Sequence, residues 1–192
     1  MKGERIKVLV ADDHTIVREG LLSLLQEQQD IVVVGAAENG RDAVEKARRT
    51  FPDIVVMDVA MPLLNGIEAT RQLQRLMPQT KVIVLTMYVD EEYVLRALQA
   101  GVRGYLLKKA AAAEFLQAIR AVARGDFYLS SDISRVIVER FLSSDNVAAV
   151  ALGRAYPGGM DAFAAAMNTK ARELEMTGSR FVEPSGLSSE NV

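Results

Sequence analysis

From Ile6 to about Arg124 the sequence alternates short apolar runs with longer stretches of helical periodicity. Five runs rich in Val and Ile predict strands at Ile6–Ala11, Ile31–Ala36, Ile54–Met57, Lys81–Leu85 and Gly104–Leu107. Because these runs are almost free of polar residues, we expect the strands to be covered on both faces, as in parallel sheets with crossover helices.

Apolar residues recur at helical spacing in the stretches that separate and follow these runs. Four of the predicted helices place these residues on a core face: Ile16, Val17, Leu21, Leu24 and Leu25; Ala43, Val44 and Ala47; Ile67, Leu73 and Leu76; Phe115, Leu116, Ile119 and Val122. A further helix is expected from an Asp90 cap to Ala100. The pattern predicts an α/β fold, a doubly wound five-stranded parallel sheet, with a C-terminal helical extension.

The pattern changes character after the fifth β–α unit. A sixth helix is expected at about 132–142, followed by two more at 145–155 and about 159–175, before a loop-like end. We therefore expect three parts: a domain over residues 1–126, a linker helix over 127–142 and a helical tail over 143–192.

Composition and charge narrow the class of protein. Of 192 residues, 49% are hydrophobic and 25% are charged, which is typical of a globular protein. Residues 1–142 carry 19 basic and 19 acidic side chains, and the tail carries 4 basic and 6 acidic ones. An acidic tail is poorly suited to neutralising phosphates, so DNA binding by the tail is not expected. Cysteine is absent, no apolar run reaches the roughly 20 residues of a membrane span, and we expect a cytoplasmic protein with no membrane contact.

Chemically active side chains follow four of the five predicted strands. They are Asp12, Asp13, Asp58, Thr86 and Lys108. In a doubly wound sheet the carboxyl ends of the strands form the ligand-binding edge, so these side chains are expected to meet there. Crowded carboxylates need a compensating cation, and Mg²⁺ prefers oxygen ligands of this kind.

Asp58 is the candidate nucleophile toward phosphorus, because it follows a buried strand and begins a loop. Asp53 precedes that strand and is interpreted as a loop-capping residue. His14 is the only histidine, and an exposed loop position suits it better than a place among Mg²⁺ ligands, because imidazole is a poor ligand for that ion.

Four motifs closely resemble the receiver domain of two-component response regulators over residues 5–142. They are Val8-Leu9-Val10-Ala11-Asp12-Asp13-His14, Asp58-Val59-Ala60-Met61-Pro62-Leu63-Leu64-Asn65-Gly66, Leu85-Thr86-Met87-Tyr88 and Gly104-Tyr105-Leu106-Leu107-Lys108. The stretch Arg18-Glu19-Gly20-Leu21 and the helix at Ser134-Arg135-Val136 resemble the subgroup that continues into a helix-turn-helix DNA-binding domain. The resemblance implies a flavodoxin-like receiver with strand order 2-1-3-4-5.

The resemblance also implies roles for individual residues. Asp58 would accept a phosphoryl group from a sensor histidine kinase, and Lys108 and Thr86 would contact that group. Mg²⁺ would be held by Asp13, Asp58 and the backbone carbonyl of Ala60, with Asp12 acting through the metal's waters. Tyr105 would move with Thr86 as the conformational switch. Such a domain would be a signalling domain and not an enzyme. It could also form a homodimer.

The tail resembles a different family, the penicillin-binding serine D,D-carboxypeptidases, over an internal stretch. The resemblance rests on residues 143–149, 152–159 and 181–192, and it suggests that the chain is a chimera joined near Leu142. The nucleophile motif Ser-x-x-Lys and the motif Lys-Thr-Gly do not occur in the sequence, which makes a carboxypeptidase-like enzyme the weakest alternative. The other alternative is a DNA-binding transcription regulator, whose expected basic output domain has no counterpart in the tail.

Overall fold

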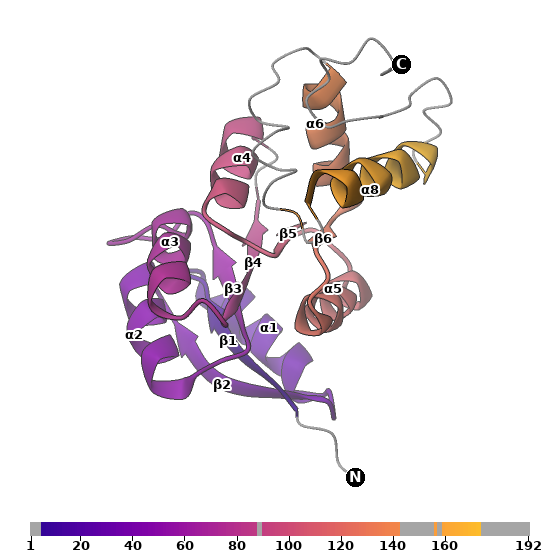
Figure 1. Cartoon of the computed structure of the whole chain (residues 1–192). Coiled ribbons are helices and arrows are strands. Elements are labelled where there is room, and N and C mark those ends of the chain that lie inside the picture. Colours follow the sequence, from indigo (N-terminus) through magenta and orange to yellow (C-terminus); the bar gives the residue numbers. More distant parts are fainter. Residues whose placement is uncertain (1–4, 88–89, 143–155, 157–158, 174–192) are drawn as a thin grey trace. The chain divides into compact units, whose positions relative to one another are not determined.

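A parallel sheet with helices on both faces forms the first of two compact units (Figure 1). The computed structural model describes residues 5–87, 90–142, 156 and 159–173. The strand order is β2-β1-β3-β4-β5-β6. The strands are β1 (Ile6–Ala11), β2 (Ile31–Ala37), β3 (Ile54–Asp58), β4 (Lys81–Thr86), β5 (Gly104–Leu107) and β6 (Tyr128–Leu129). The pairings from β2 through β5 are parallel, which confirms the predicted sheet and its order 2-1-3-4-5.

Four helices belong to this first unit, which comprises Met1–Tyr88 and Ala100–Tyr128. They are α1 (Thr15–Gln26), α2 (Gly40–Thr50), α3 (Gly66–Leu76) and α5 (Ala112–Arg124). The side chains of Asn39 and Asn65 each accept a backbone hydrogen bond of 2.9 Å at the start of α2 and α3. Gly125, with a φ of 103°, ends α5 in the left-handed region that glycine adopts without strain. Local capping therefore sets where these helices begin and end.

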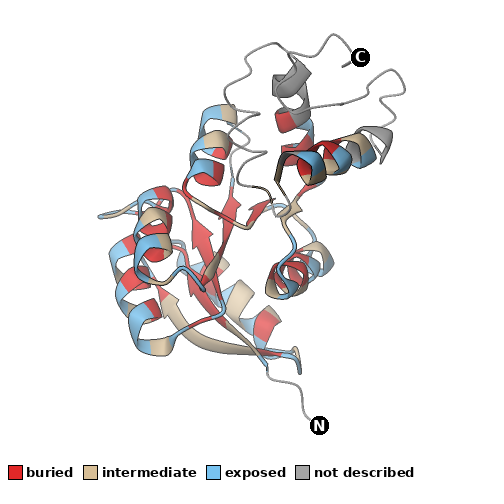
Figure 2. Ribbon diagram, in the orientation of Figure 1, coloured by how far each residue is buried: buried red, intermediate tan, exposed pale blue. Residues whose placement is uncertain are grey.

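The core has two layers, one on each face of the sheet (Figure 2). Helices α1 and α5 cover one face, where Leu25, Phe115 and Ile119 pack with inward residues of β1, β3 and β4. Helices α2 and α3 lie on the other face and bury Val44 and Leu73. Because side chains alternate along a strand, the near-continuous apolar runs of β1, β3 and β4 serve both layers at once.

Two local predictions were wrong. Ile16 and Leu76 were expected in the core, but they are 87% and 54% exposed. In α1 the polar Arg18 is buried instead. The two-residue strand β6 was not predicted, because so short a segment carries no periodicity; the N–H of Tyr128 donates to the carbonyl of Arg103 at 3.0 Å.

The second unit comprises Val89–Gln99 and Leu129–Val192. Its described helices are α4 (Glu91–Gln99), α6 (Ser131–Leu142) and α8 (Gly159–Glu173). Helix α6 contacts both α4 and α8. The carboxylate of Asp90 caps α4 as predicted, and Phe163 and Met167 of α8 are buried. The helix predicted at 145–155 lies outside the described residues.

Among the described residues, no helix combines the length and apolar character needed to cross a membrane.

Candidate functional site

Two buried carboxylates and one lysine meet at the carboxyl edge of the sheet. Asp12 directly follows β1 and is 1% exposed, while Asp58 ends β3 and is 3% exposed. Lys108 directly follows β5, and its backbone N–H donates to the carbonyl of Thr86 at 2.7 Å, which ties the ends of β4 and β5 together. The parallel register of β1, β3, β4 and β5 therefore brings these residues together, as the sequence predicted.

The ammonium group of Lys108 bridges the two buried carboxylates. Its Nζ lies 2.8 Å from Oδ2 of Asp12 and 2.8 Å from Oδ2 of Asp58. Burial alone would lower the pKa of Lys108, but the hydrogen bonds from Nζ to both carboxylates and the negative charges of these carboxylates together raise it. Lys108 is therefore charged at neutral pH and is the fixed cation of the site.

The carboxyl group of Asp58 has a raised pKa. Burial is the main cause, the negative charge of Asp12 adds to it, and the hydrogen bond from Lys108 opposes both. One lysine thus compensates two buried carboxylates only in part, and the site can accept further positive charge.

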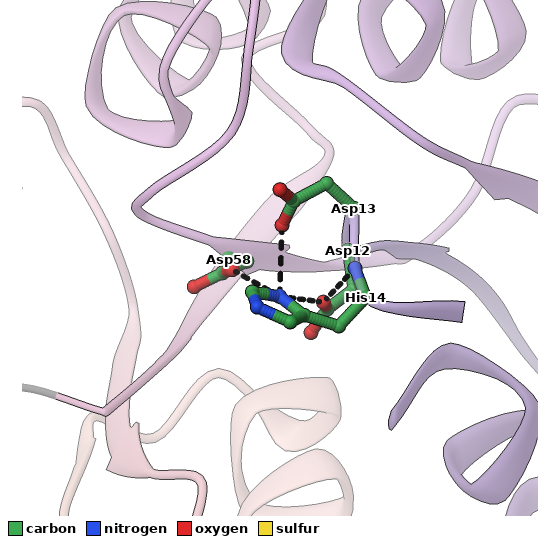
Figure 3. A group of neighbouring side chains, drawn as sticks. All are labelled: Asp12, Asp13, His14 and Asp58. Carbon is green, nitrogen blue, oxygen red and sulfur yellow. Dashed lines mark hydrogen bonds and ion pairs between the residues drawn. The ribbon is translucent and has the colours of Figure 1, made fainter. Parts of the chain in front are cut away.

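A third carboxylate and the only histidine complete the cluster (Figure 3). The His14 ring lies among the carboxylates of Asp12, Asp13 and Asp58, and its Nδ1 is 3.0 Å from Oδ1 of Asp13. The His14 side chain is 62% exposed, which agrees with the loop position expected for it, but the direction of its ring was not predicted. One ligand atom from each of the four residues lies within 4.8 Å of the others.

Arg18 contacts the main chain of this site, and the sequence pattern did not identify it as a functional residue. Its Nη1 donates to the backbone carbonyl of Asp12 at 2.6 Å, and its Nη2 donates to Oε1 of Glu38 at 2.9 Å. The available signal was an arginine on the helix face that carries Leu21 and Leu25, three and seven positions later. We therefore regard Arg18 as a positioning residue.

The loop after β3 approaches Asp58 closely. A Cβ atom on Gly66 would overlap the backbone carbonyl of Asp58, so only glycine fits at the start of α3. The N–H groups of Gly66 and Met61 both donate to the carbonyl of Val59. Ala60, two residues after Asp58, is exposed in this loop.

The donor set suits Mg²⁺. Three carboxylates from two strand ends offer the hard oxygen ligands that this ion prefers. The two negative charges of Asp12 and Asp58 exceed the single positive charge of Lys108.

Asp53 lies apart from the cluster. Its Oδ2 accepts a hydrogen bond from the backbone N–H of Lys7 at 2.7 Å, in agreement with its interpretation as a capping residue.

Thr86 and Tyr105 occupy one face of neighbouring strands. Val84 pairs with Tyr105 and Thr86 pairs with Leu107, so the four side chains share a face of the sheet. Thr86 is 1% exposed and Tyr105 is fully buried. The threonine is therefore both the end of β4 and a diagonal neighbour of the tyrosine.

Two family models match the chain. Residues 8–120 match the response regulator receiver domain, and residues 109–192 match D-alanyl-D-alanine carboxypeptidase. The second match includes the whole tail, and the two overlap over residues 109–120. Neither of these two matches is to a helix-turn-helix domain. Such a domain is the output domain of the response regulator subgroup that the sequence resembles.

Known proteins similar to the chain agree with the first match. The response regulator GacA of Pseudomonas syringae pv. syringae (strain B728a) is 45% identical over 130 residues, which are 68% of this chain and 61% of GacA. The uncharacterized transcriptional regulatory protein YxjL of Bacillus subtilis (strain 168) is 40% identical over 142 residues, 73% of this chain and 65% of YxjL. The chain thus spans less than two thirds of either relative.

The fold also matches a crystal structure of a two-component response regulator of the LuxR family from Aurantimonas sp. SI85-9A1. The TM-score is 0.69 at 36% identity, over 72% of this chain and 99% of that one.

Proposed function

Because the chain belongs to the family of response regulator receiver domains, we propose that it is a phosphoacceptor of a two-component relay. In this proposal Asp58 accepts a phosphoryl group from a sensor histidine kinase in the presence of Mg²⁺, and the domain changes conformation in response. The observation that carries the proposal is the Lys108 ammonium group, 2.8 Å from the carboxylates of both Asp12 and Asp58 at the edge of the sheet.

Asp58 would act as the nucleophile. One of its carboxylate oxygens would form the new bond to phosphorus while the bond from phosphorus to the kinase histidine nitrogen breaks and its electron pair stays on that nitrogen. Burial raises the pKa of Asp58, and the hydrogen bond from Lys108 opposes this rise, so the lysine favours the ionised carboxylate that would attack phosphorus. Asp58 ends β3 and leads into a loop that contains the exposed Ala60.

Lys108 would stabilise the negative charge that arrives with the phosphoryl group. Its ammonium group is held between Asp12 and Asp58 before the reaction, so little reorganisation is needed when an oxygen of the phosphoryl group replaces one of these partners. Asp13, Asp58, the backbone carbonyl of Ala60 and, through water, Asp12 would hold Mg²⁺. When bound, this ion supplies positive charge next to the phosphoryl oxygens.

The conformational change would begin at Thr86. The hydroxyl of Thr86 is expected to bind the phosphoryl group, and its diagonal neighbour Tyr105 shares the same face of the sheet. A shift of Thr86 toward the site would change the packing around the buried tyrosine, and packed side chains respond in discrete steps because cores are close-packed.

The output is proposed to be transcription regulation. Receiver domains are signalling domains, and YxjL is named a transcriptional regulatory protein. Because the chain spans 61–65% of GacA and YxjL, a DNA-binding function of the whole protein stays a proposal, and the acidic tail is not proposed to supply it. A shift of mixed-sequence DNA in a gel by this chain, lost with added salt, would assign DNA binding to these residues.

We also propose that the chain is a chimera divided near Leu142. The support is the carboxypeptidase family model, whose match includes all of residues 143–192. Deleting residues 143–192 is expected to leave phosphoryl acceptance by Asp58 intact, and penicillin labelling is expected to give no adduct with the full chain.

Beryllofluoride, which mimics a phosphoryl group on a carboxylate, tests the proposed function. The full chain is expected to bind beryllofluoride only when Mg²⁺ is present, with a rise in melting temperature and a bound ¹⁹F NMR signal. Asp58→Asn should show neither effect, and the matched variant Asp53→Asn should behave as the wild type. An equal response from wild type and Asp58→Asn would contradict the proposal.

A further inference from the structure

The only histidine of the chain directs its ring at the three carboxylates of the proposed metal site (Figure 3). Nδ1 of His14 lies 3.0 Å from Oδ1 of Asp13, 3.3 Å from Oδ1 of Asp12 and 4.0 Å from Oδ2 of Asp58. The backbone N–H of His14 also donates to Oδ1 of Asp12 at 2.9 Å. Side chain and main chain of His14 are thus both engaged with the cluster.

The separation of Nδ1 from Oδ1 of Asp13 would suit adjacent ligands around one octahedral ion. With metal–ligand bonds of about 2.1 Å, adjacent ligand atoms lie about 3.0 Å apart and opposite ones about 4.2 Å apart. The Nδ1 atom of His14 stands at an adjacent-ligand distance from Asp13 and slightly farther from Asp12. The oxygen of Asp58 that lies 4.0 Å from Nδ1 is the one that Lys108 also contacts.

The two carboxylate oxygens of Asp12 contact different residues. Oδ2 lies 2.8 Å from Nζ of Lys108, and Oδ1 faces His14. A cation beside His14 would therefore use Oδ1 of Asp12, which Lys108 does not contact, and it would share Oδ2 of Asp58 with Lys108.

We propose that His14 is a nitrogen ligand of this site and makes the chain prefer late first-row divalent ions, Co²⁺, Ni²⁺ and Zn²⁺, over Mg²⁺. The inference rests on the proposed function, because it assigns the same carboxylates to the metal. Mg²⁺ takes oxygen ligands, whereas imidazole suits the later ions, whose affinity for mixed nitrogen and oxygen sites is also higher. His14 is the residue that adds nitrogen to an otherwise all-oxygen set.

Replacing His14 should leave the fold intact. Its side chain is 62% exposed and makes no capping hydrogen bond to α1, although His14 is the N-cap residue. His14→Gln therefore removes the imidazole without removing a core contact or a helix cap.

Metal titration by calorimetry on the full, untagged chain gives the first test. For His14→Gln we expect the affinity for Co²⁺ to fall about tenfold or more, and the affinity for Mg²⁺ to fall by less than about threefold. Asp13→Asn is the matched variant, and it should weaken both ions because it removes a ligand common to both. Equal weakening of Co²⁺ and Mg²⁺ by His14→Gln would overturn the inference.

Proton NMR of the Co²⁺-loaded chain gives the second test. Paramagnetic Co²⁺ shifts the ring protons of a bound imidazole far outside the normal window, and with one histidine in the sequence such signals can come only from His14. We expect these signals in the wild type and their loss in His14→Gln at saturating Co²⁺.

The two proposals fail in different ways. The wild type could bind Mg²⁺ and beryllofluoride but give no shifted imidazole signal with Co²⁺. This result would contradict the role of His14 and would still agree with the phosphoacceptor function. A wild type that binds neither Mg²⁺ nor Co²⁺ contradicts both.

Discussion

Nζ of Lys108 lies 2.8 Å from Oδ2 of Asp58, although 50 positions separate the two residues in the sequence. The same nitrogen is 2.8 Å from Asp12, so removing the lysine would leave two buried carboxylates facing each other without a cation. The stability of the receiver and its chemistry therefore depend on one ammonium group.

Lys108→Gln should destabilise the chain by about 3 kcal/mol in the absence of divalent ions, because a broken buried pair leaves uncompensated charge. Saturating Mg²⁺ should recover part of this loss by supplying the missing positive charge. Urea unfolding with Mg²⁺ and with a chelator measures both effects. The neighbouring exposed residue gives the control: Lys109→Gln should change the free energy of unfolding by less than about 0.5 kcal/mol.

Asp58→Asn should stabilise the metal-free chain at neutral pH. Burial raises the pKa of Asp58 with help from the charge of Asp12, so the folded state disfavours the ionised carboxylate relative to the unfolded state. The penalty is complete above the raised folded pKa and vanishes as pH falls below the unfolded value of 3.8. The advantage of the asparagine in urea unfolding should therefore shrink on acidification. An asparagine variant that is less stable than the wild type at neutral pH would show that Lys108 already outweighs burial.

Gly66→Ala should cost about 2 kcal/mol or more, because its Cβ would overlap the carbonyl of Asp58 and force α3 or the loop away from the site. Gly20→Ala is a control with the opposite sign. Gly20 lies inside α1 with nothing within 4 Å of an added Cβ, so alanine should stabilise the helix by about 0.5–1 kcal/mol. Chemical unfolding of both variants checks the pair, and similar free-energy changes in the two would contradict the close approach at Gly66.

Arg18→Lys should weaken Mg²⁺ binding by about tenfold, because one ammonium group cannot reproduce the two directed bonds from Arg18 to the Asp12 carbonyl and to Glu38. Calorimetric titration with Mg²⁺ measures the change. Arg49→Lys, at a site whose side chain is 70% exposed, should bind Mg²⁺ as the wild type does. Unchanged affinity in Arg18→Lys would limit the role of Arg18 to packing.

Strong periodicity made most of the first unit predictable. The five longer strands agree with the predicted runs to within one residue at each end, because each is a continuous apolar segment bounded by polar residues. The carboxyl edge followed from the same pattern, since a parallel sheet aligns the ends of β1, β3, β4 and β5. The residue roles at this edge stay predictions until they are tested.

What sequence could not supply was side-chain direction. Ile16 and Arg18 are two positions apart in α1, and the hydrophobic pattern predicted that Ile16 lies in the core. Instead Ile16 is exposed, and Arg18 is buried with hydrogen bonds to Asp12 and Glu38. The ring of His14 turns toward the acidic cluster, a direction that a hydrophobic pattern does not record. Both departures lie beside the proposed site, where polar contacts override apolar periodicity.

Phosphoryl transfer to Asp58 is the central claim, and mass spectrometry after reaction with a small acyl phosphate donor and Mg²⁺ tests it most directly. The wild type and Asp53→Asn should gain the mass of one phosphoryl group, and borohydride trapping should place it on the peptide that contains Asp58. Asp58→Asn and the wild type with a chelator should gain none. Equal phosphoryl incorporation by Asp58→Asn, or a trapped site on any other residue of the wild type, would contradict the account.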